Sequence, residues 1–220
     1  MLMDSQKDSQ PFVEASENVL TALEDLRAVA HFFFEMGMLK RTARSGFQFL
    51  GSGKESVADH SFRVAIIGFA LARLSGHEDP YRVVCLCLFH DMAEARTGDM
   101  NYVNKQYVSV HEDKAVQDLT RRLPFGAELR SFMEEYREGQ TEAALLAHDA
   151  DQLDLLLELK QQQDLGNAYA TQWIRYAIER LQTSVGRDAA RVIVETDSAA
   201  WWFDGHEDWW APKHRPNENP

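Results

Sequence analysis

Apolar residues recur three and four positions apart in one segment of this chain after another, which is the spacing of a buried helical face. In residues 60–75, for example, Val64, Ile67 and Leu71 fall on one side of a helix. No segment alternates apolar and polar residues over the length of a strand, and neither hairpin turns nor internal repeats are evident. We therefore predict an all-α fold of about seven or eight helices in a single domain.

The chain has 220 residues, enough for one domain with a sizeable core. We expect a disordered tail at 1–12, the helical domain at 13–200 and a tryptophan-rich C-terminal extension at 201–220. The helices are expected at 13–38, 60–75, 81–96, 104–121, 126–138, 140–165, 167–183 and 187–200. Asp59 is the expected N-cap of the second helix, and Gly186 the expected break between the last two.

The formal net charge of −12 argues against binding to a nucleic acid polymer or to an anionic membrane. It does not exclude a small phosphate ester, because a metal ion can supply positive charge locally. No apolar run reaches the length of a membrane span, and the N-terminus lacks the apolar core of a signal peptide. Cys85 and Cys87 lie two positions apart on an expected helix and cannot readily pair, so we predict thiols in the cytoplasm.

The stretch His90 to Asp99, HDMAEARTGD, packs one imidazole, three carboxylates and a glycine turn into ten residues. On a helix, Glu94 lies on the same side as both His90 and Asp91. His90 and Asp91 diverge by about 100° around the helix axis, but they can straddle one ion. Asp91 also falls on the apolar stripe, where a carboxylate is costly unless it binds a metal or is held by an arginine or backbone donors.

Two other expected helices also carry polar groups on apolar stripes. His60 begins one stripe, and either Asp149 or Asp151 lies on another; periodicity does not choose between these two aspartates. Two imidazoles and two carboxylates are together a ligand set suited to a divalent first-row metal.

The basic connection at 39–59 is either a solvated loop or an anion-binding loop, since arginine can bind a phosphate with two hydrogen bonds.

The order H…HD…D resembles the HD-domain metal-dependent phosphohydrolase superfamily and, within it, the HD-domain 5′-deoxyribonucleotidases. Four segments carry the resemblance: LKRTARSGF (39–47), ESVADHSFRVA (55–65), LFHDMAEARTGD (88–99) and HDADQLDLL (148–156). An HD dipeptide alone is weak evidence, whereas HDxxExxxGD preceded by SVxDHS is specific. The resemblance implies a metal-dependent phosphomonoesterase that hydrolyses deoxynucleoside 5′-monophosphates, and it implies a homodimer.

The resemblance also implies a ligand set for one divalent ion, which could be Mn, Co, Mg, Zn, Fe or Ni. His60, His90, Asp91 and Asp151 match the metal ligands of the family. The step Asp151-Gln152-Leu153 fits the family pattern for the last ligand and disfavours Asp149.

Further roles are implied for residues that would act on the substrate. Glu94 matches the carboxylate that handles the attacking water, and Asp99 the one that contacts the sugar and assists proton transfer. Arg44 matches the arginine that orients the phosphate. Phe47 stands near the position where some members have tryptophan, and we expect it to bind substrate.

Three alternatives are kept. In the first, the substrate is a different small phosphoester. In the second, the chain is an HD-fold di-iron oxygenase, for which His111 and His148 are the only additional histidine candidates between the HD pair and the last aspartate. In the third, it is a non-catalytic helical dimer stabilised by a structural metal. Glu94 and Asp99 speak against the last alternative, because a structural site has no use for them.

Overall fold

The computed structural model describes residues 10–203 and residue 205, and in this part of the chain the fold is all-α without any strand. Eight longer helices account for most of it: α1 (Gln10–Met36), α3 (Val57–Ser75), α4 (Pro80–Phe89), α6 (Glu112–Thr120), α7 (Gly126–Glu138), α8 (Glu142–Asp164), α9 (Ala168–Glu179) and α10 (Ser184–Glu195). Short turns of helix are α2 (Phe47–Leu50), α5 (Glu94–Thr97), α11 (Ala200–Phe203), η1 (Gly37–Lys40) and η2 (Asn104–Gln106). The predicted fold class is confirmed.

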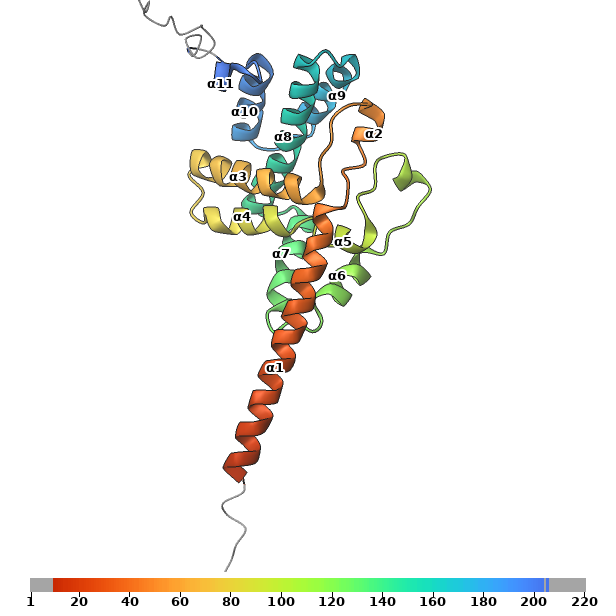
Figure 1. The fold of residues 1–220 in the computed structure, drawn as a ribbon. Coiled ribbons are helices and arrows are strands. Elements are labelled where there is room, and N and C mark those ends of the chain that lie inside the picture. The colour runs from red at the N-terminus through yellow and green to blue at the C-terminus, as the bar shows by residue number, and fades with distance from the viewer. Residues whose placement is uncertain (1–9, 204, 206–220) are drawn as a thin grey trace, which may run out of the picture.

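Helix α8 is the centre of the domain, because it packs against α3, α4, α7, α9 and α10. It buries apolar residues on several sides, including Leu146, Leu153, Leu156 and Leu159, as a helix enclosed by others must. Helices α3 and α4 lie side by side across it, whereas α1 extends away from the body of the domain (Figure 1). No helix in the described residues is long and apolar enough to cross a membrane.

The start of α3 differs from expectation. Ser56 is the N-cap, and its hydroxyl accepts a hydrogen bond from the backbone N–H of Asp59, whose carboxylate accepts one from the backbone N–H of Ser56. Asp59 is therefore the third residue of the helix and completes a capping box, not the cap itself. The helix consequently begins at Val57 and holds His60 in its first turn.

The expected continuous helix at 81–96 is interrupted. Helix α4 ends at Phe89, residues 90–93 form turns, and α5 follows at once. The backbone N–H groups of Met92 and Glu94 donate to the carbonyls three residues earlier, which tightens the chain around the HD pair. Similarly, the expected helix at 104–121 is a loop with the short η2 and begins as α6 only at Glu112.

Gly186 does not separate the last two helices. Helix α10 begins at Ser184, Thr183 is its N-cap, and Gly186 lies in the first turn, where a Cβ would collide with the Asp149 carboxylate. That carboxylate is fully buried and accepts hydrogen bonds from the backbone N–H groups of Gln182 (2.7 Å) and Thr183 (2.8 Å) and from the Thr183 hydroxyl (2.5 Å). Asp149 thus ties α8 to the start of α10.

At the ends, α1 begins three residues before the expected boundary, so residues 10–12 are helical and are not tail. The tail at 1–9 and most of the tryptophan-rich extension lie outside the described residues. Of the extension, the structure describes residues 201–203 and 205, and Trp201 and Trp202 lie in α11.

Asp149→Asn is expected to lower the free energy of unfolding by about 2 kcal/mol, because an amide nitrogen would replace one of the two oxygens with which this buried side chain accepts from backbone donors. Urea unfolding followed by circular dichroism measures the change. Asp188→Asn, at an exposed position of α10, is the control. Equal midpoints for Asp149→Asn and the parent protein would contradict the role given to Asp149.

Candidate active site

The site lies where the first turn of α3, the turn after α4 and the middle of α8 meet. His60 comes from α3, His90 and Asp91 from the turn, and Asp151 from α8. His60 Nε2 lies 3.2 Å from Asp151 Oδ1 and 3.6 Å from Asp91 Oδ2, and His90 Nε2 lies 3.1 Å from Asp91 Oδ2. The structure therefore brings together all four residues that the resemblance marks as ligands.

Both imidazoles are oriented through their Nδ1 atoms. His90 Nδ1 lies 2.8 Å from the carbonyl oxygen of Cys87, which can only accept, so this nitrogen carries a proton and donates. His60 Nδ1 lies 2.7 Å from Asp154 Oδ2 and donates in the same way. When neutral, as a metal ligand must be, each ring presents the lone pair of Nε2 to the site.

Neither Nε2 atom has a hydrogen-bond partner among the described residues, although both are buried. A buried nitrogen without a partner is costly in a helical core. Two such atoms next to the carboxylates of Asp91 and Asp151 fit a divalent cation, for which neutral imidazole and carboxylate are both ordinary ligands. In the described chain, His60, His90 and Asp91 also offer ligand atoms that all lie within 4.8 Å of one another.

The electrostatics of the site favour a positive charge among these groups. Burial alone would raise the pKa of Asp151, but the neighbouring His60, His90 and Arg44 hold it below its ordinary value. Burial alone would lower the pKa of His60, but the nearby carboxylates of Asp151 and Asp154 raise it to about 10. The carboxylates are thus ionised, and the site attracts a cation.

The structure also separates the two aspartates that periodicity could not. Asp151 faces His60, whereas Asp149 is turned toward α10. Sequence reasoning gave no role to Asp154, which holds His60 Nδ1. The available signal was its position three residues after Asp151, which puts both carboxylates on one side of α8.

Glu94 lies in α5 with its carboxylate largely buried, and its Oε2 lacks a hydrogen-bond partner within the described chain. Burial, and then repulsion from Asp91 and Asp99, raises the pKa of Glu94 to about 9. A carboxyl group with a raised pKa and a free oxygen at the edge of a cavity is suited to accept and return protons.

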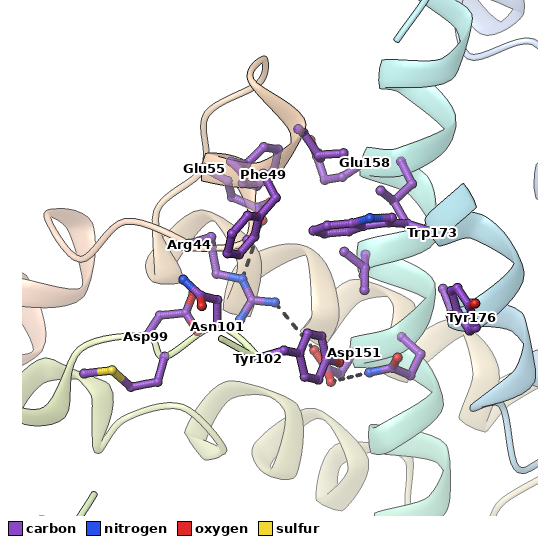
Figure 2. A pocket seen from close by; sticks show the side chains of 18 of the residues that line it. Arg44, Phe49, Glu55, Asp99, Asn101, Tyr102, Asp151, Glu158, Trp173 and Tyr176 are labelled. Atoms are coloured by element: carbon purple, nitrogen blue, oxygen red, sulfur yellow. Dashed lines mark hydrogen bonds and ion pairs between the residues drawn. The ribbon is translucent and has the colours of Figure 1, made fainter. Parts of the chain in front are cut away.

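Arg44 and Asp99 complete this end of the site. Arg44 Nη1 lies 3.4 Å from Asp91 Oδ2, and Arg44 Nη2 lies 4.0 Å from Asp151 Oδ1. Asp99 Oδ2 accepts hydrogen bonds from the backbone N–H (2.5 Å) and the hydroxyl (3.1 Å) of Ser45. Asp99 therefore holds the loop that presents Arg44. Figure 2 shows the Arg44 guanidinium and its contact with Asp151.

A pocket of about 500 Å³ opens from these residues. Its polar end is lined by Arg44, His90, Asp91, Glu94, Asp99 and Asp151, and its other walls include Phe47, Phe49, Tyr102, Trp173 and Tyr176. His60 is fully buried beneath the polar end. The pocket is of a size that accepts a small organic ligand, and it leaves space beyond a phosphate.

The two histidines needed for a di-iron site do not join this centre. His148 Nε2 lies 2.7 Å from the carbonyl oxygen of Tyr136, and His111 precedes α6 at an exposed position. Neither belongs to a cluster of potential metal ligands in the part of the chain that the structure describes. The arrangement gives no support to the oxygenase alternative.

An all-α fold with a His, His-Asp and Asp centre defines a class of protein, and the comparisons agree with it. A family model described as HD domain matches residues 36–192, so this chain belongs to the HD-domain family. The chain is 33% identical over 147 residues to the 5′-deoxynucleotidase HDDC2 of Bos taurus, covering 64% of this chain and 71% of the relative. It is 30% identical over 156 residues to a 5′-deoxynucleotidase of Erwinia tasmaniensis, covering 63% and 76%.

Solved structures show the same fold. A conserved hypothetical protein from Pyrococcus furiosus is 27% identical with a TM-score of 0.65, covering 76% of this chain and 99% of the other. A protein from Magnetospirillum magnetotacticum, described as a predicted metal-dependent phosphohydrolase, is 25% identical with a TM-score of 0.62, covering 78% and 92%.

Asp151→Asn is expected to weaken metal binding at least tenfold, because a neutral amide replaces an anionic ligand. Calorimetric titration of the metal-free protein with Mn²⁺ or Co²⁺ measures the dissociation constant. Asp149→Asn is the matched control, two residues away on the same helix, and should bind metal nearly as the parent does. The reverse ranking of the two variants would show that Asp151 is not a ligand.

Proposed function

We propose that this protein is a metal-dependent phosphomonoesterase that hydrolyses deoxynucleoside 5′-monophosphates to deoxynucleoside and phosphate. The observation that carries the proposal is the pair of buried Nε2 atoms, on His60 and His90, that face two carboxylates beside Glu94 and Arg44. The names of the relatives, 5′-deoxynucleotidases at 30% and 33% identity, support the choice of substrate.

In this proposal, His60, His90, Asp91 and Asp151 hold one divalent ion, which we take to be Mn, Co, Mg, Zn, Fe or Ni. When bound, such an ion activates a water molecule and offsets negative charge on the phosphate. Arg44 orients the phosphate, since its guanidinium lies at the edge of the carboxylate pair and can donate two hydrogen bonds.

Glu94 takes the proton of the attacking water in this scheme. This role requires its ionised form, which the positive charge of a bound divalent ion would favour. The water oxygen forms a bond to phosphorus, the bond from phosphorus to the 5′ oxygen breaks, and Glu94 returns the proton it took to the leaving oxygen. Asp99 lies within the same pocket and keeps the proposed contact with the sugar, while its Oδ2 positions the Arg44 loop through Ser45. Hydrolysis needs no covalent enzyme intermediate.

Release of phosphate from a panel of substrates tests the proposal. The purified protein with Mn²⁺ or Co²⁺ is given the four deoxynucleoside 5′-monophosphates, the matching ribonucleotides and other small monophosphates. The proposal expects the deoxynucleotides to have the highest kcat/KM. A better substrate of another kind would favour the alternative phosphoester, and no turnover of any monophosphate would favour the non-catalytic dimer.

Glu94→Gln is expected to retain one metal ion per chain but to lose turnover by about 100-fold or more, the scale for loss of a general acid or base. Metal content by mass spectrometry and phosphate release are measured on the same sample. Glu112→Gln, at an exposed position in the first turn of α6, is the control. Activity of Glu94→Gln within a few-fold of the parent would remove Glu94 from the reaction.

We also propose a homodimer. Helix α1 leaves Leu26, Phe33 and Phe34 exposed, and α3 leaves Phe62 and Ile66 exposed, so two elements present apolar surface to solvent. Large apolar side chains exposed together on a protein surface are typical of an association face. The expected result of sedimentation at micromolar concentration is a dimer; a monomer would contradict the proposal.

Location in the cytoplasm stays a prediction from the sequence.

A further inference from the structure

We propose that Phe49 and Trp173 form the base-binding part of the pocket, which receives the flat aromatic ring of the substrate by stacking. This inference rests on the proposed function, because it assigns the end of the pocket away from the metal centre. Neither residue lies in one of the four segments that carry the family resemblance. The first of these segments ends at Phe47, two residues before Phe49. We call these two side chains the aromatic pair.

The aromatic pair joins two elements that are far apart in the chain. Phe49 comes from α2 and Trp173 from α9, and their ring centroids lie 6.3 Å apart with planes inclined at 50°. Both rings line the pocket, and Figure 2 shows them above the Arg44 guanidinium and Asp151. An inclined pair leaves ring faces open, on which a planar group can stack.

The exposure of Phe49 has no explanation in the packing of α2. In this four-residue helix, Phe47 packs against the core and Leu50 is buried in it, whereas Phe49 remains 44% exposed. Phe47, the residue expected to bind substrate, lines the pocket with a ring that also serves the core. Phe49 is therefore the ring of α2 that is open to a ligand.

The position of Trp173 places the aromatic pair next to the phosphate end. A Cβ built on Gly46 would lie 3.8 Å from Cζ3 of Trp173, so the indole lies against the loop that carries Arg44 two residues earlier. A ligand whose phosphate meets Arg44 therefore reaches Trp173 along the same loop. The pocket volume of about 500 Å³ leaves space for a ring system beside the phosphate.

The helix that carries Phe49 is held in place by three polar contacts, two of them partly buried. Asn167 Nδ2 donates to the carbonyl oxygen of Leu50 (2.8 Å) and to the Ser52 hydroxyl (2.7 Å), which in turn donates to Gln162 Oε1 (2.6 Å). Asn167 is also the N-cap of α9, the helix of Trp173. One residue thus links both halves of the aromatic pair, and this preorganises them for a ligand.

The chemistry of the aromatic pair selects a flat, uncharged ring over an aliphatic or a second anionic group. Stacking on aromatic side chains tolerates all bases, because every base has a π-face. The amide of Gln152 already donates one hydrogen bond to Asp151 (2.9 Å) and accepts one from Arg180 (3.4 Å). We therefore assign to the aromatic pair affinity for the base as such.

The test compares a nucleotide with a substrate that lacks only the base. The metal-loaded protein and the variants Trp173→Leu, Trp173→Phe and Phe49→Leu are assayed with deoxyadenosine 5′-monophosphate and with 2-deoxyribose 5-phosphate. Tyr169→Leu is the matched control, because this exposed aromatic residue lies one turn earlier on α9 and does not line the pocket.

We expect Trp173→Leu and Phe49→Leu to lower kcat/KM for the nucleotide by about tenfold, mainly through KM, and to leave the base-free substrate within about twofold. Trp173→Phe should recover most of the loss. Equal losses on both substrates would show a merely structural role and overturn the inference, as would no loss on the nucleotide. Phe49 is exposed, so its variant should fold even if a Trp173 variant does not.

Calorimetry with deoxyadenosine separates this inference from the proposed function. If the parent protein hydrolyses no nucleotide, the proposed function is wrong, and the binding measurement still decides the role of the aromatic pair. Tighter binding of deoxyadenosine by the parent than by Phe49→Leu supports the aromatic pair as a base site. Equal binding by the two proteins overturns it.

Discussion

The hydrogen bond between His60 Nδ1 and Asp154 joins the first turn of α3 to the central helix α8, and the site depends on it. Asp154 is fully buried, so its negative charge requires compensation. Arg63 supplies it: Nε donates to Asp154 Oδ1 (2.5 Å), and Nη1 lies 2.6 Å from Glu158. The α3–α8 interface is therefore both a packing surface and the support that orients one imidazole.

The same helix α8 serves two unrelated tasks through residues two positions apart. Asp151 turns toward the histidines, while Asp149 turns away and closes the start of α10. Because the side chains of such residues point to nearly opposite sides of a helix, one can be changed without direct effect on the other. Asp149 thus ties two helices together and Asp151 belongs to the candidate metal site, although both lie within a single turn.

The sequence was sufficient to predict the helical class and most long helices. Polar groups on apolar stripes pointed to His60, Asp91 and one of two aspartates of α8, and only the family resemblance chose Asp151. The sequence was insufficient where tertiary contacts decide the local backbone. The turn at 90–93 interrupts a run whose periodicity continues through it, and Gly186 is required by the approach of Asp149 rather than by a helix end. Trp173 was not found, because an aromatic residue on an amphipathic helix gives no sign of what it faces.

The fixed orientation of the two imidazoles bears on how a divalent ion would bind at the site. Since both Nδ1 protons are already committed to Cys87 and Asp154, both rings are oriented toward the site without an ion bound. Exchange of one divalent ion for another then depends on supply and on the intrinsic order of affinities, not on chain rearrangement.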